Sequence, residues 1–509
     1  MTLFAQVADV SRRVSATQSR NEKVALIAQA LREARPDERA VIADYLAGTL
    51  PQRRVGIGGR SLRSNPSDAV EEATVDVLDL DATLTRMEDL RGTGSNTRRR
   101  EMLDELWGRL TEQERRLLTG LLLGDARQGA GDGVMLKAIA AAAQVKETDV
   151  RRAVMLAGRT GPVAAIALDG GAPALEEVRL EVGRPLRPML AGSSPDVESV
   201  VEEPGEWTVE VKLDGIRLQA HKIGDEVRLF TRSLDDITAR LPDVVEVVRA
   251  LPAKEAVLDG EAIALRPDGR PEPFQVTGAR TASSADPDEL RRNVPLTALF
   301  FDLMHLDGDD LVDEPLHVRR ERLERLVPQQ HVVTAVRPTN SAAAQGFFED
   351  WVGRGHEGVV AKRLDSVYAA GRRGSGWVKV KPRHTLDLVV LAVEEGSGRR
   401  KGFLSNIHLG ARDPNTGDFI MLGKTFKGMT DEMLAWQTER FTDLMTDRDD
   451  WVVRVRPEQV VEIAFDGLQK STRYPGGVAL RFARVLRYRD DKTAEQADTI
   501  DEVRRLAQW

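Results

Sequence analysis

The residues best suited to chemistry in this sequence lie in one short stretch, KLDGIR at 212–217. Lys212 ends a segment in which apolar and polar residues alternate, and a Leu-Asp-Gly turn follows it. A lysine at the end of a strand, partly desolvated or beside other cations, can lose its proton and act as a nucleophile. The K-x-D-G pattern is short, however, and by itself it favours a surface lysine before a tight turn.

Further motifs, found in a fixed order along the chain, change this interpretation. They are EVKLDGIR (210–217), LFTRSLDDIT (229–238), VLDGEAIA (257–264), LFFDLMHLDG (299–308), EGVVAKR (357–363), WVKVKP (377–382) and LRFARVLRYRDDK (480–492). This ordered set resembles the motifs of ATP-dependent DNA ligases. These enzymes belong to the covalent nucleotidyltransferase superfamily, which also includes mRNA capping enzymes and RNA ligases. Seven matches in order are far more specific than one K-x-D-G.

The resemblance implies a role for each matched residue. Lys212 would be the catalytic nucleophile, whose neutral amine attacks the α-phosphorus of ATP, forms a lysyl phosphoramidate and releases pyrophosphate. Glu210, two residues earlier on the same strand face, would contact the adenine. Arg217 and Arg232 would hold phosphate or ribose oxygens. Phe301 would stack on the purine, although FFDLMHL also fits a buried strand in which either phenylalanine belongs to the core.

An acidic pair and a basic segment complete the expected site. Glu261 and Glu357 are the expected ligands of Mg²⁺, or of Mn²⁺ in its place, because phosphoryl transfer needs a metal that neutralises charge on phosphate oxygens. Glu261 could instead contact the ribose.

The segment GRRGSG at 371–376 fits a phosphate clamp before WVKVKP. By resemblance, Arg373 contacts the nucleotide, with Arg372 one residue off. Lys379 and Lys381 would meet the α-phosphate and help depress the pKa of Lys212.

The last motif is expected to act from a different part of the chain. By resemblance, Arg481 and Arg484 swing over ATP, orient the pyrophosphate in line with the lysine, and then move away so that DNA can be clamped. The same motif contains Lys492. The alternatives for the two arginines are a contact with DNA or simple solvation.

Hydrophobic periodicity predicts three regions. Residues 1–182 favour helices, with apolar residues at helical spacing in 22–33, 100–124 and 134–143. Short alternating segments with interspersed helices predict a mixed α+β fold over 183–385. Residues 386–509 predict about five strands, the last two at 451–465 and 480–489, and a helix near 430–446. That pattern suits an OB-fold barrel.

The resemblance assigns a function to each region. Residues 1–182 would be a helical DNA-binding domain, with GDARQGAGDGVMLKAIA (124–140) as the clearest match. Residues 183–385 would be the adenylation (nucleotidyltransferase) domain, and 386–509 the OB-fold domain. The expected partner is nicked duplex DNA, sealed in repair, replication or recombination by a monomer that replication or repair proteins recruit.

Composition limits the alternatives. The chain has 509 residues and no cysteine, which excludes disulfides, thiolate zinc sites, iron–sulfur clusters and a cysteine nucleophile. It also disfavours an NAD-dependent ligase, which is expected to carry a cysteine zinc module. No apolar run approaches the ~20 residues that span a bilayer. A cytoplasmic, nucleoid-associated protein without a membrane partner is therefore expected.

The negative net charge does not exclude nucleic acid as a partner. The formal charge is −8, from 73 basic and 81 acidic residues, but a whole-chain average does not describe one face. Basic residues cluster locally, at 98–100, 372–383, 399–401 and 481–489.

An mRNA capping or RNA-sealing enzyme would share the K-x-D-G core, but the helical N-terminal region argues against it. A non-catalytic nick-binding scaffold would not need Lys212, Glu357 and Lys379.

Overall fold

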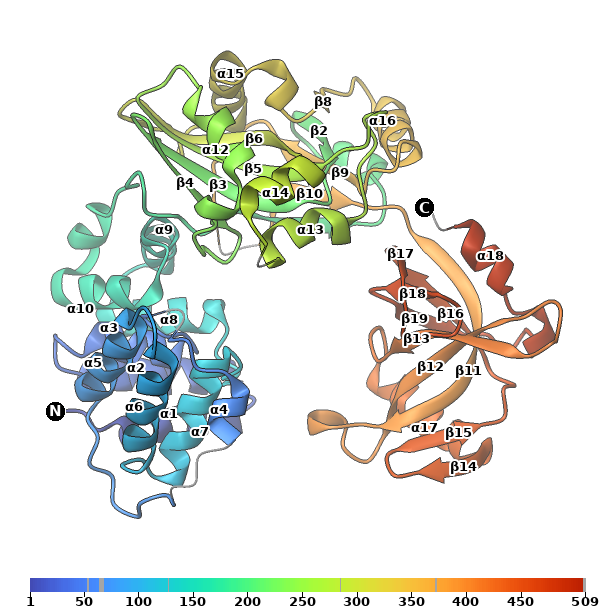
Figure 1. Cartoon of the computed structure of the whole chain (residues 1–509), viewed down its shortest axis with the longest axis horizontal. Coiled ribbons are helices and arrows are strands. Elements are labelled where there is room, and N and C mark those ends of the chain that lie inside the picture. The colour runs from blue at the N-terminus through green and yellow to red at the C-terminus, as the bar shows by residue number, and fades with distance from the viewer. Residues whose placement is uncertain (53–54, 64–67, 127, 284, 371–372, 507–509) are drawn as a thin grey trace. The chain divides into compact units, whose positions relative to one another are not determined.

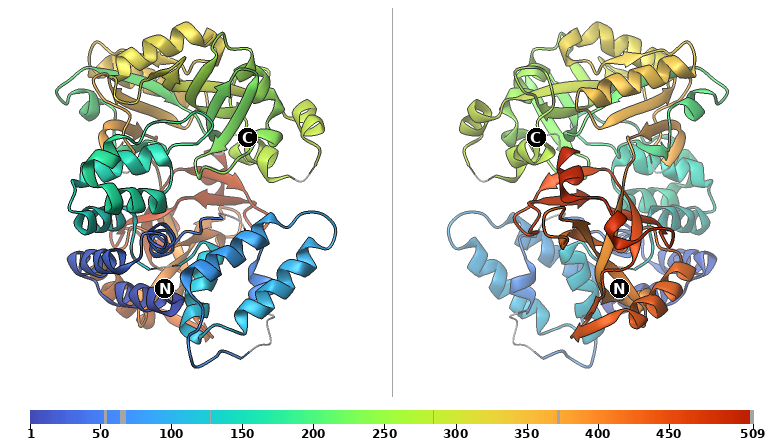
Figure 2. Two further views of the ribbon diagram at one scale, coloured as in Figure 1. Left: turned by 90° about the vertical axis from the view of Figure 1, so that its left-hand side faces the viewer. Right: turned by 90° about the vertical axis from the view of Figure 1, so that its right-hand side faces the viewer.

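The N-terminal region is all-helical in the computed structural model, which describes residues 1–509 except 53–54, 64–67, 127, 284, 371–372 and 507–509 (Figure 1). Its helices are α1 (Phe4–Ala16), α2 (Arg20–Glu33), α3 (Arg39–Leu46), α4 (Gly59–Arg63), α5 (Val77–Asp89), α6 (Ser95–Trp107), α7 (Glu112–Leu123), α8 (Asp132–Ala143), α9 (Glu147–Ala157) and α10 (Thr160–Glu176). Their apolar stripes share one core, in which Ile27 and Leu31 of α2 are fully buried. Figure 2 shows only helices and loops in this blue-to-teal part of the chain.

The central region contains two sheets. One has the order β4-β3-β5-β6-β7 and is antiparallel; the other has the order β1-β10-β9-β2-β8. The strands are β1 (Leu190–Ser194), β2 (Trp207–Lys212), β3 (Ile216–Ile223), β4 (Glu226–Thr231), β5 (Glu255–Ala264), β6 (Leu296–Leu306), β7 (Asp309–Asp310), β8 (Ala335–Val336), β9 (Gly358–Arg363) and β10 (Arg373–Val380). The accompanying helices are α11 (Glu198–Val201), α12 (Pro242–Arg249), α13 (Phe274–Ala282), α14 (Pro287–Asn293), α15 (Leu316–Leu326) and α16 (Ser341–Gly353).

Helices α12 and α15 build the core of the first sheet. Both pack against β6, and their valines and leucines share a core with residues of β3, β4 and β5. Strand side chains alternate between two faces, so the residues that alternate with this core lie on the opposite face. Arg217 alternates with the core residue Leu218, and Asp259 with Leu258. The chemical groups of this sheet therefore lie on the face that the helices do not cover.

The C-terminal region is rich in strands. They are β11 (His384–Glu395), β12 (Leu404–Arg412), β13 (Phe419–Thr425), β14 (Met445–Asp449), β15 (Val452–Val455), β16 (Val460–Phe465), β17 (Gly467–Lys470), β18 (Val478–Arg481) and β19 (Arg484–Tyr488), with α17 (Asp431–Asp443) and α18 (Ile500–Arg505). The long strand β11 pairs with β12, β15 and β16. Pairings among the described strands give the order β13-β12-β11-β15-β14, with β16 and β19 as a branch, and do not close into a ring.

The predicted fold class is confirmed: a helical region, a mixed α+β region and a strand-rich region with a helix at 431–443. Two predicted strands were wrong. The segment 451–465 forms β15 and β16, because Pro457 lies in the turn between them and cannot donate to a sheet ladder. The segment 480–489 is divided between β18 and β19 at Phe482, whose φ of +55° is not a strand conformation.

Backbone contacts divide the chain into two compact units. The first comprises 1–192, 204–337 and 361–378; the second comprises 193–203, 338–360 and 379–509. The domain limits at 182 and 385 stay a prediction. Within the described residues, no helix combines the length and apolar character needed to cross a bilayer.

His221 of β3 makes the stability of the central sheet sensitive to acid. Its side chain is 1 % exposed, and its Nδ1 accepts the N–H of Gly183 at 3.0 Å. Burial lowers the pKa of His221 to about 3. An unfolded chain would protonate this histidine near pH 6.5, so between pH 6.5 and 3 the unfolded state binds more protons and the folded state loses stability.

We therefore expect the free energy of unfolding to fall below pH 6.5, by at most about 1.4 kcal/mol per pH unit from this group. His221→Asn keeps an acceptor for Gly183 and removes the titration. Urea unfolding at pH 7 and pH 5 should show a smaller loss in the variant than in the parent. Equal losses would contradict the assignment.

Candidate active site

Lys212 lies at the end of β2, directly before the turn that leads into β3. In this turn the N–H of Gly215 donates to Oε1 of Glu261 at 2.7 Å. A Cβ at Gly215 would lie 2.4 Å from the carbonyl oxygen of Ala262, so only glycine permits this approach to β5. Lys212 is partly exposed, and its Nζ lies 3.3 Å from the carbonyl oxygen of Leu213. The predicted lysine therefore sits at a strand end, before a turn whose Gly215 contacts the predicted carboxylate Glu261.

Arg217, the second residue of β3, is held by a buried carboxylate. Its Nε and Nη2 donate to Oδ1 and Oδ2 of Asp259 at 3.2 and 2.7 Å, and Asp259 is 0 % exposed. Burial disfavours the charged guanidinium, but Asp259 outweighs it and raises the pKa of Arg217 above its ordinary value. A bidentate pair of this kind fixes the orientation of the guanidinium.

An aromatic pair lies near Arg217. Phe300 belongs to the core, whereas Phe301 is partly exposed and meets Trp377 edge-on with the ring centroids 5.9 Å apart. Phe301 is the extra residue of a β-bulge, because Phe300 pairs with Gly260 while Asp302 pairs with Asp259. Of the two phenylalanines, Phe301 is thus the one available to a ligand.

Glu210 is buried rather than solvated. It is 2 % exposed; Lys362 lies 2.5 Å from one carboxylate oxygen, and Arg320 of α15 donates to the other at 3.2 Å. Burial lowers the pKa of Lys362, although Glu210 opposes this shift. The ammonium of Lys362 also lies 4.5 Å from the centre of the Phe301 ring. Glu210, Lys362 and Phe301 therefore form one continuous group.

A second group of charges lies in the other compact unit. Lys381 forms ion pairs with Glu357 and, at 3.2 Å, with Asp466. Arg484 lies 3.7 Å from the other oxygen of Asp466. Burial opposes the charge on Lys381, but Glu357 and Asp466 raise its pKa. The predicted metal ligand Glu357 thus already carries a cationic partner from the WVKVKP motif.

Of the other residues singled out from the sequence, two contact other parts of the chain, and two lie wholly or partly outside the described residues. Arg232 lines a cavity of about 690 Å³ together with Asp44 and Arg159 of the helical region and with Arg187, which precedes β1. Lys492 donates to Asp387 at the start of β11. Arg373 begins β10, but its side chain and the whole of Arg372 lie outside the described residues.

Lys379, near the end of β10, is partly exposed. Arg481, which ends β18, is likewise partly exposed, and its guanidinium lies 5.9 Å from the centre of the Phe482 ring.

Sequence reasoning missed the residues that hold the predicted ones. Asp259 had a signal, since a carboxylate inside the apolar segment VLDGEAIA needs a partner when buried. No sequence signal pointed to Arg320 or to Tyr368. The hydroxyl of Tyr368 donates to Asp259 at 2.7 Å.

No cluster of three or more His, Asp or Glu side chains suited to a metal ion occurs among the described residues. Glu261 and Glu357 nevertheless offer the hard oxygen donors that Mg²⁺ takes, usually one or two at a time with water and phosphate. The donor chemistry therefore fits this metal.

Comparison with known proteins gives consistent matches along the chain. Residues 188–381 match the family described as ATP dependent DNA ligase domain, 400–492 its C-terminal region, and 59–140 the DNA ligase N terminus. A probable DNA ligase of Beutenbergia cavernae is 60% identical over 516 residues, covering 99% of each chain. One from Anaeromyxobacter dehalogenans is 55% identical over 509 residues, again covering 99% of each chain.

The solved structure Pmar-Lig_PreS3 has a similar fold, with a TM-score of 0.61 and 18% identity over 95% of this chain and 99% of that chain.

Proposed function

Because the chain belongs to the ATP-dependent DNA ligase family, we propose that it seals nicks in duplex DNA through an AMP adduct on Lys212. The observation that carries the proposal is the turn at 213–215. Lys212 directly precedes this turn, Arg217 is the second residue of the strand that follows it, and Gly215 contacts Glu261 from within it. A nucleophilic amine, a fixed guanidinium and a carboxylate are thereby brought to one short turn.

The reaction consists of three phosphoryl transfers. In the first, the neutral amine of Lys212 forms a bond to the α-phosphorus of ATP, the bond to pyrophosphate breaks, and the amine loses a proton. In the second, an oxygen of the 5′-phosphate at the nick bonds to the phosphorus of AMP, and the P–N bond to Lys212 breaks. In the third, the 3′-hydroxyl attacks the phosphorus of that 5′-phosphate, a phosphodiester bond forms, and the bond to AMP breaks so that AMP leaves.

The chain's own residues supply binding and orientation. Arg217, held by Asp259, offers fixed donors to phosphate or ribose oxygens. Phe301 and Glu210 are the proposed contacts of the purine, with Lys362 against both. Lys379 and Arg373 are proposed phosphate contacts, as is Arg232. Its place in a cavity beside the helical region also suits a DNA phosphate.

Glu261 and Glu357 are the residues that would hold Mg²⁺, or Mn²⁺ in its place; when bound, the metal would neutralise charge on the phosphate oxygens. Glu357 pairs with Lys381, so metal binding there requires the lysine to give way.

Glu357→Gln should therefore slow lysyl-AMP formation by about 100-fold and raise the Mg²⁺ concentration that gives half the maximal rate. Glu349→Gln, an exposed glutamate of α16, is the matched control. An unchanged Mg²⁺ requirement in Glu357→Gln would remove this residue from the metal site.

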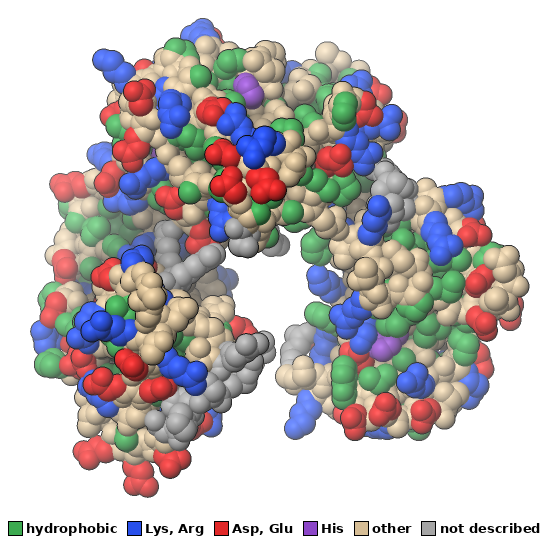
Figure 3. All heavy atoms as spheres, viewed as in Figure 1, with side chains coloured by type: hydrophobic (Ala, Val, Ile, Leu, Met, Phe, Trp, Pro, Cys, Tyr) green, Lys and Arg blue, Asp and Glu red, His purple; other side chains and the backbone are tan. Residues whose placement is uncertain are grey.

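Nicked duplex DNA is the proposed partner despite the negative net charge. Lys and Arg side chains are interspersed with Asp and Glu over the visible face (Figure 3), so local phosphate contacts remain available. Because such contacts release counterions, binding to a nicked duplex should weaken steeply as salt rises. Fluorescence anisotropy with a labelled nicked duplex measures this, and a flat salt response would contradict phosphate-dominated binding.

The proposal includes the setting of the enzyme. One chain carries all seven motifs, so we propose that a monomer is active, in the cytoplasm where it meets the nucleoid and the replication or repair proteins that recruit it.

A gel assay on a nicked duplex tests the activity directly. With protein freed of bound AMP, we expect sealing with ATP and none with NAD. Sealing with neither nucleotide, or with NAD alone, would contradict the proposal. In a separate incubation with radiolabelled ATP or GTP, label retained on the protein from GTP alone would favour a capping enzyme.

A further inference from the structure

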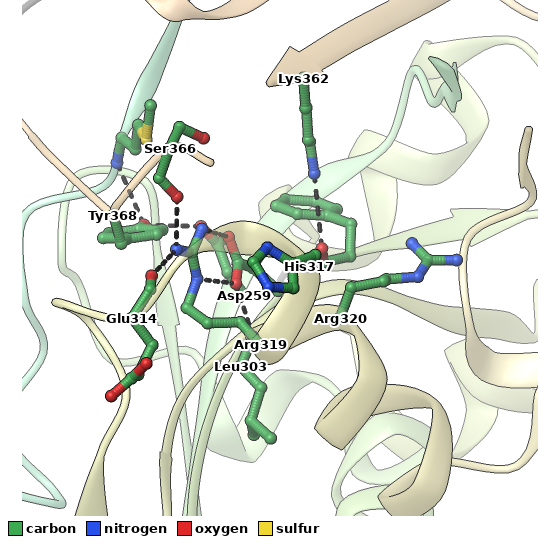
Figure 4. Close-up of polar contacts among 12 residues, drawn as sticks. Asp259, Leu303, Glu314, His317, Arg319, Arg320, Lys362, Ser366 and Tyr368 are labelled. Atoms are coloured by element: carbon green, nitrogen blue, oxygen red, sulfur yellow. Dashed lines mark hydrogen bonds and ion pairs between the residues drawn. The ribbon is translucent and has the colours of Figure 1, made fainter. Parts of the chain in front are cut away.

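Tyr368, which none of the motifs includes, is joined to the centre of the site by its hydroxyl group. It lies between β9 and β10 and is 1 % exposed. Its hydroxyl donates to Oδ2 of Asp259 at 2.7 Å and accepts the N–H of Met189 at 3.1 Å. Figure 4 shows Tyr368 beside Asp259, with hydrogen bonds drawn between the residues of this group. Both hydrogen-bonding capacities of the phenol are thus used inside the protein.

Asp259 receives three donors, two from Arg217 and one from Tyr368. Oδ2 accepts from both residues, so the phenol fixes the same oxygen that takes the shorter of the two bonds from Arg217. A carboxylate with no exposed surface cannot replace a lost donor with water. The orientation of Arg217 therefore depends on Tyr368 through Asp259. Among the described residues, no hydrogen bond joins Arg217 to Tyr368 directly.

The hydroxyl acts as a donor over the whole working pH range. Burial raises the pKa of Tyr368 well above its ordinary value, and the neighbouring Asp259 raises it further. The phenol therefore stays protonated.

The segment that carries Tyr368 is itself held in place. The N–H of Ala369 lies 3.4 Å from the sulfur of Met189, and the N–H of Ala370 lies 3.2 Å from the sulfur of Met155. The ring of Tyr368 meets Trp377 edge-on, with centroids 5.9 Å apart. Tyr368 therefore contacts Asp259 from a segment that has its own contacts with Met189, Met155 and Trp377.

We propose that Tyr368 is a positioning residue, whose hydroxyl fixes the Asp259 carboxylate and through it aims the guanidinium of Arg217 at the oxygens of the bound nucleotide. The inference rests on the proposed function, since it requires that Arg217 contact ATP. It assigns to Tyr368 a part in the reaction without contact with the reacting atoms.

Tyr368→Phe tests this by removing one oxygen atom. We expect the second-order rate constant for lysyl-AMP formation to fall about tenfold, the size expected for one hydrogen bond to a charged group. Tyr45→Phe is the matched control, because Tyr45 is a fully buried tyrosine whose hydroxyl lies 3.5 Å from Asp81 in the helical region. Tyr45→Phe should form lysyl-AMP at the parent rate. Thermal melting should place both variants within a few degrees of the parent.

Repeating the Tyr368→Phe substitution in an Arg217→Lys variant separates a positioning role of Tyr368 from a merely structural one. In Arg217→Lys the bidentate pair with Asp259 is gone, so adding Tyr368→Phe should change the remaining rate by less than about twofold. A tenfold loss in both backgrounds, or no loss in the parent background, would overturn the inference. A parent protein that forms no lysyl-AMP would overturn the proposed function, and this inference with it.

Discussion

Lys212→Ala is expected to lower ATP-dependent nick sealing by about 10⁴-fold or more, because the variant has no amine to accept AMP. The measurement is a single-turnover sealing assay on a nicked duplex with ATP. Sealing of a nick that already carries AMP on its 5′-phosphate should lose much less, since the nucleophile in that step is the 3′-hydroxyl. The two substrates thus separate the first transfer from the last.

Lys254→Ala is the control for Lys212→Ala, because Lys254 is an exposed lysine of the same region. It should seal at the parent rate. If Lys212→Ala sealed nicks from ATP as well as the parent, catalysis would belong to another lysine.

Arg319→Met is expected to cost the most stability. Arg319 and Asp302 are both 0 % exposed and form a bidentate pair at 2.7 and 2.9 Å. Arg319 also donates to the carbonyl oxygens of Glu314 and Ser366, at 2.6 and 2.9 Å (Figure 4). Removing the guanidinium leaves a buried carboxylate without its counter-ion, so we expect the free energy of unfolding to fall by about 3–5 kcal/mol in urea denaturation.

Two further variants test the cause of this loss. Asp302→Leu added to Arg319→Met removes the unpaired charge and should recover part of the stability. It should not recover all of it, because the carbonyl oxygen of Glu314 loses the donor that Arg319 supplied, whereas that of Ser366 still accepts the N–H of Leu316. Arg322→Met, on the same helix, breaks an exposed ion pair with Asp309 and should cost about 0–1 kcal/mol. Equal losses in Arg319→Met and Arg322→Met would show that burial does not set the cost.

The local motifs were predicted well where a strand and a turn determine the geometry. Lys212 lies at the strand end that its spacing indicated, and Gly215 makes the close approach that a glycine in this turn allows. Alternation along a strand could not choose between Phe300 and Phe301. The bulge at Phe301 decides which of them joins the core, and a bulge depends on pairing between β5 and β6.

Contacts between distant segments could not be predicted. Glu210 meets Lys362 and Arg320, and Asp259 meets Tyr368, only after the sheets and α15 pack together. Arg232 follows a hairpin strand, and its motif gives no information about which neighbouring element its side chain faces. In the C-terminal region, a short turn at Pro457 divides the segment 451–465, which was predicted to be one strand.

The most direct test of the central claim is peptide mass spectrometry of the parent protein after incubation with ATP and Mg²⁺. We predict one AMP per chain, on the peptide that contains Lys212, and its loss when nicked duplex DNA is added. AMP on a different residue, or an AMP adduct that nicked DNA does not discharge, would contradict the account.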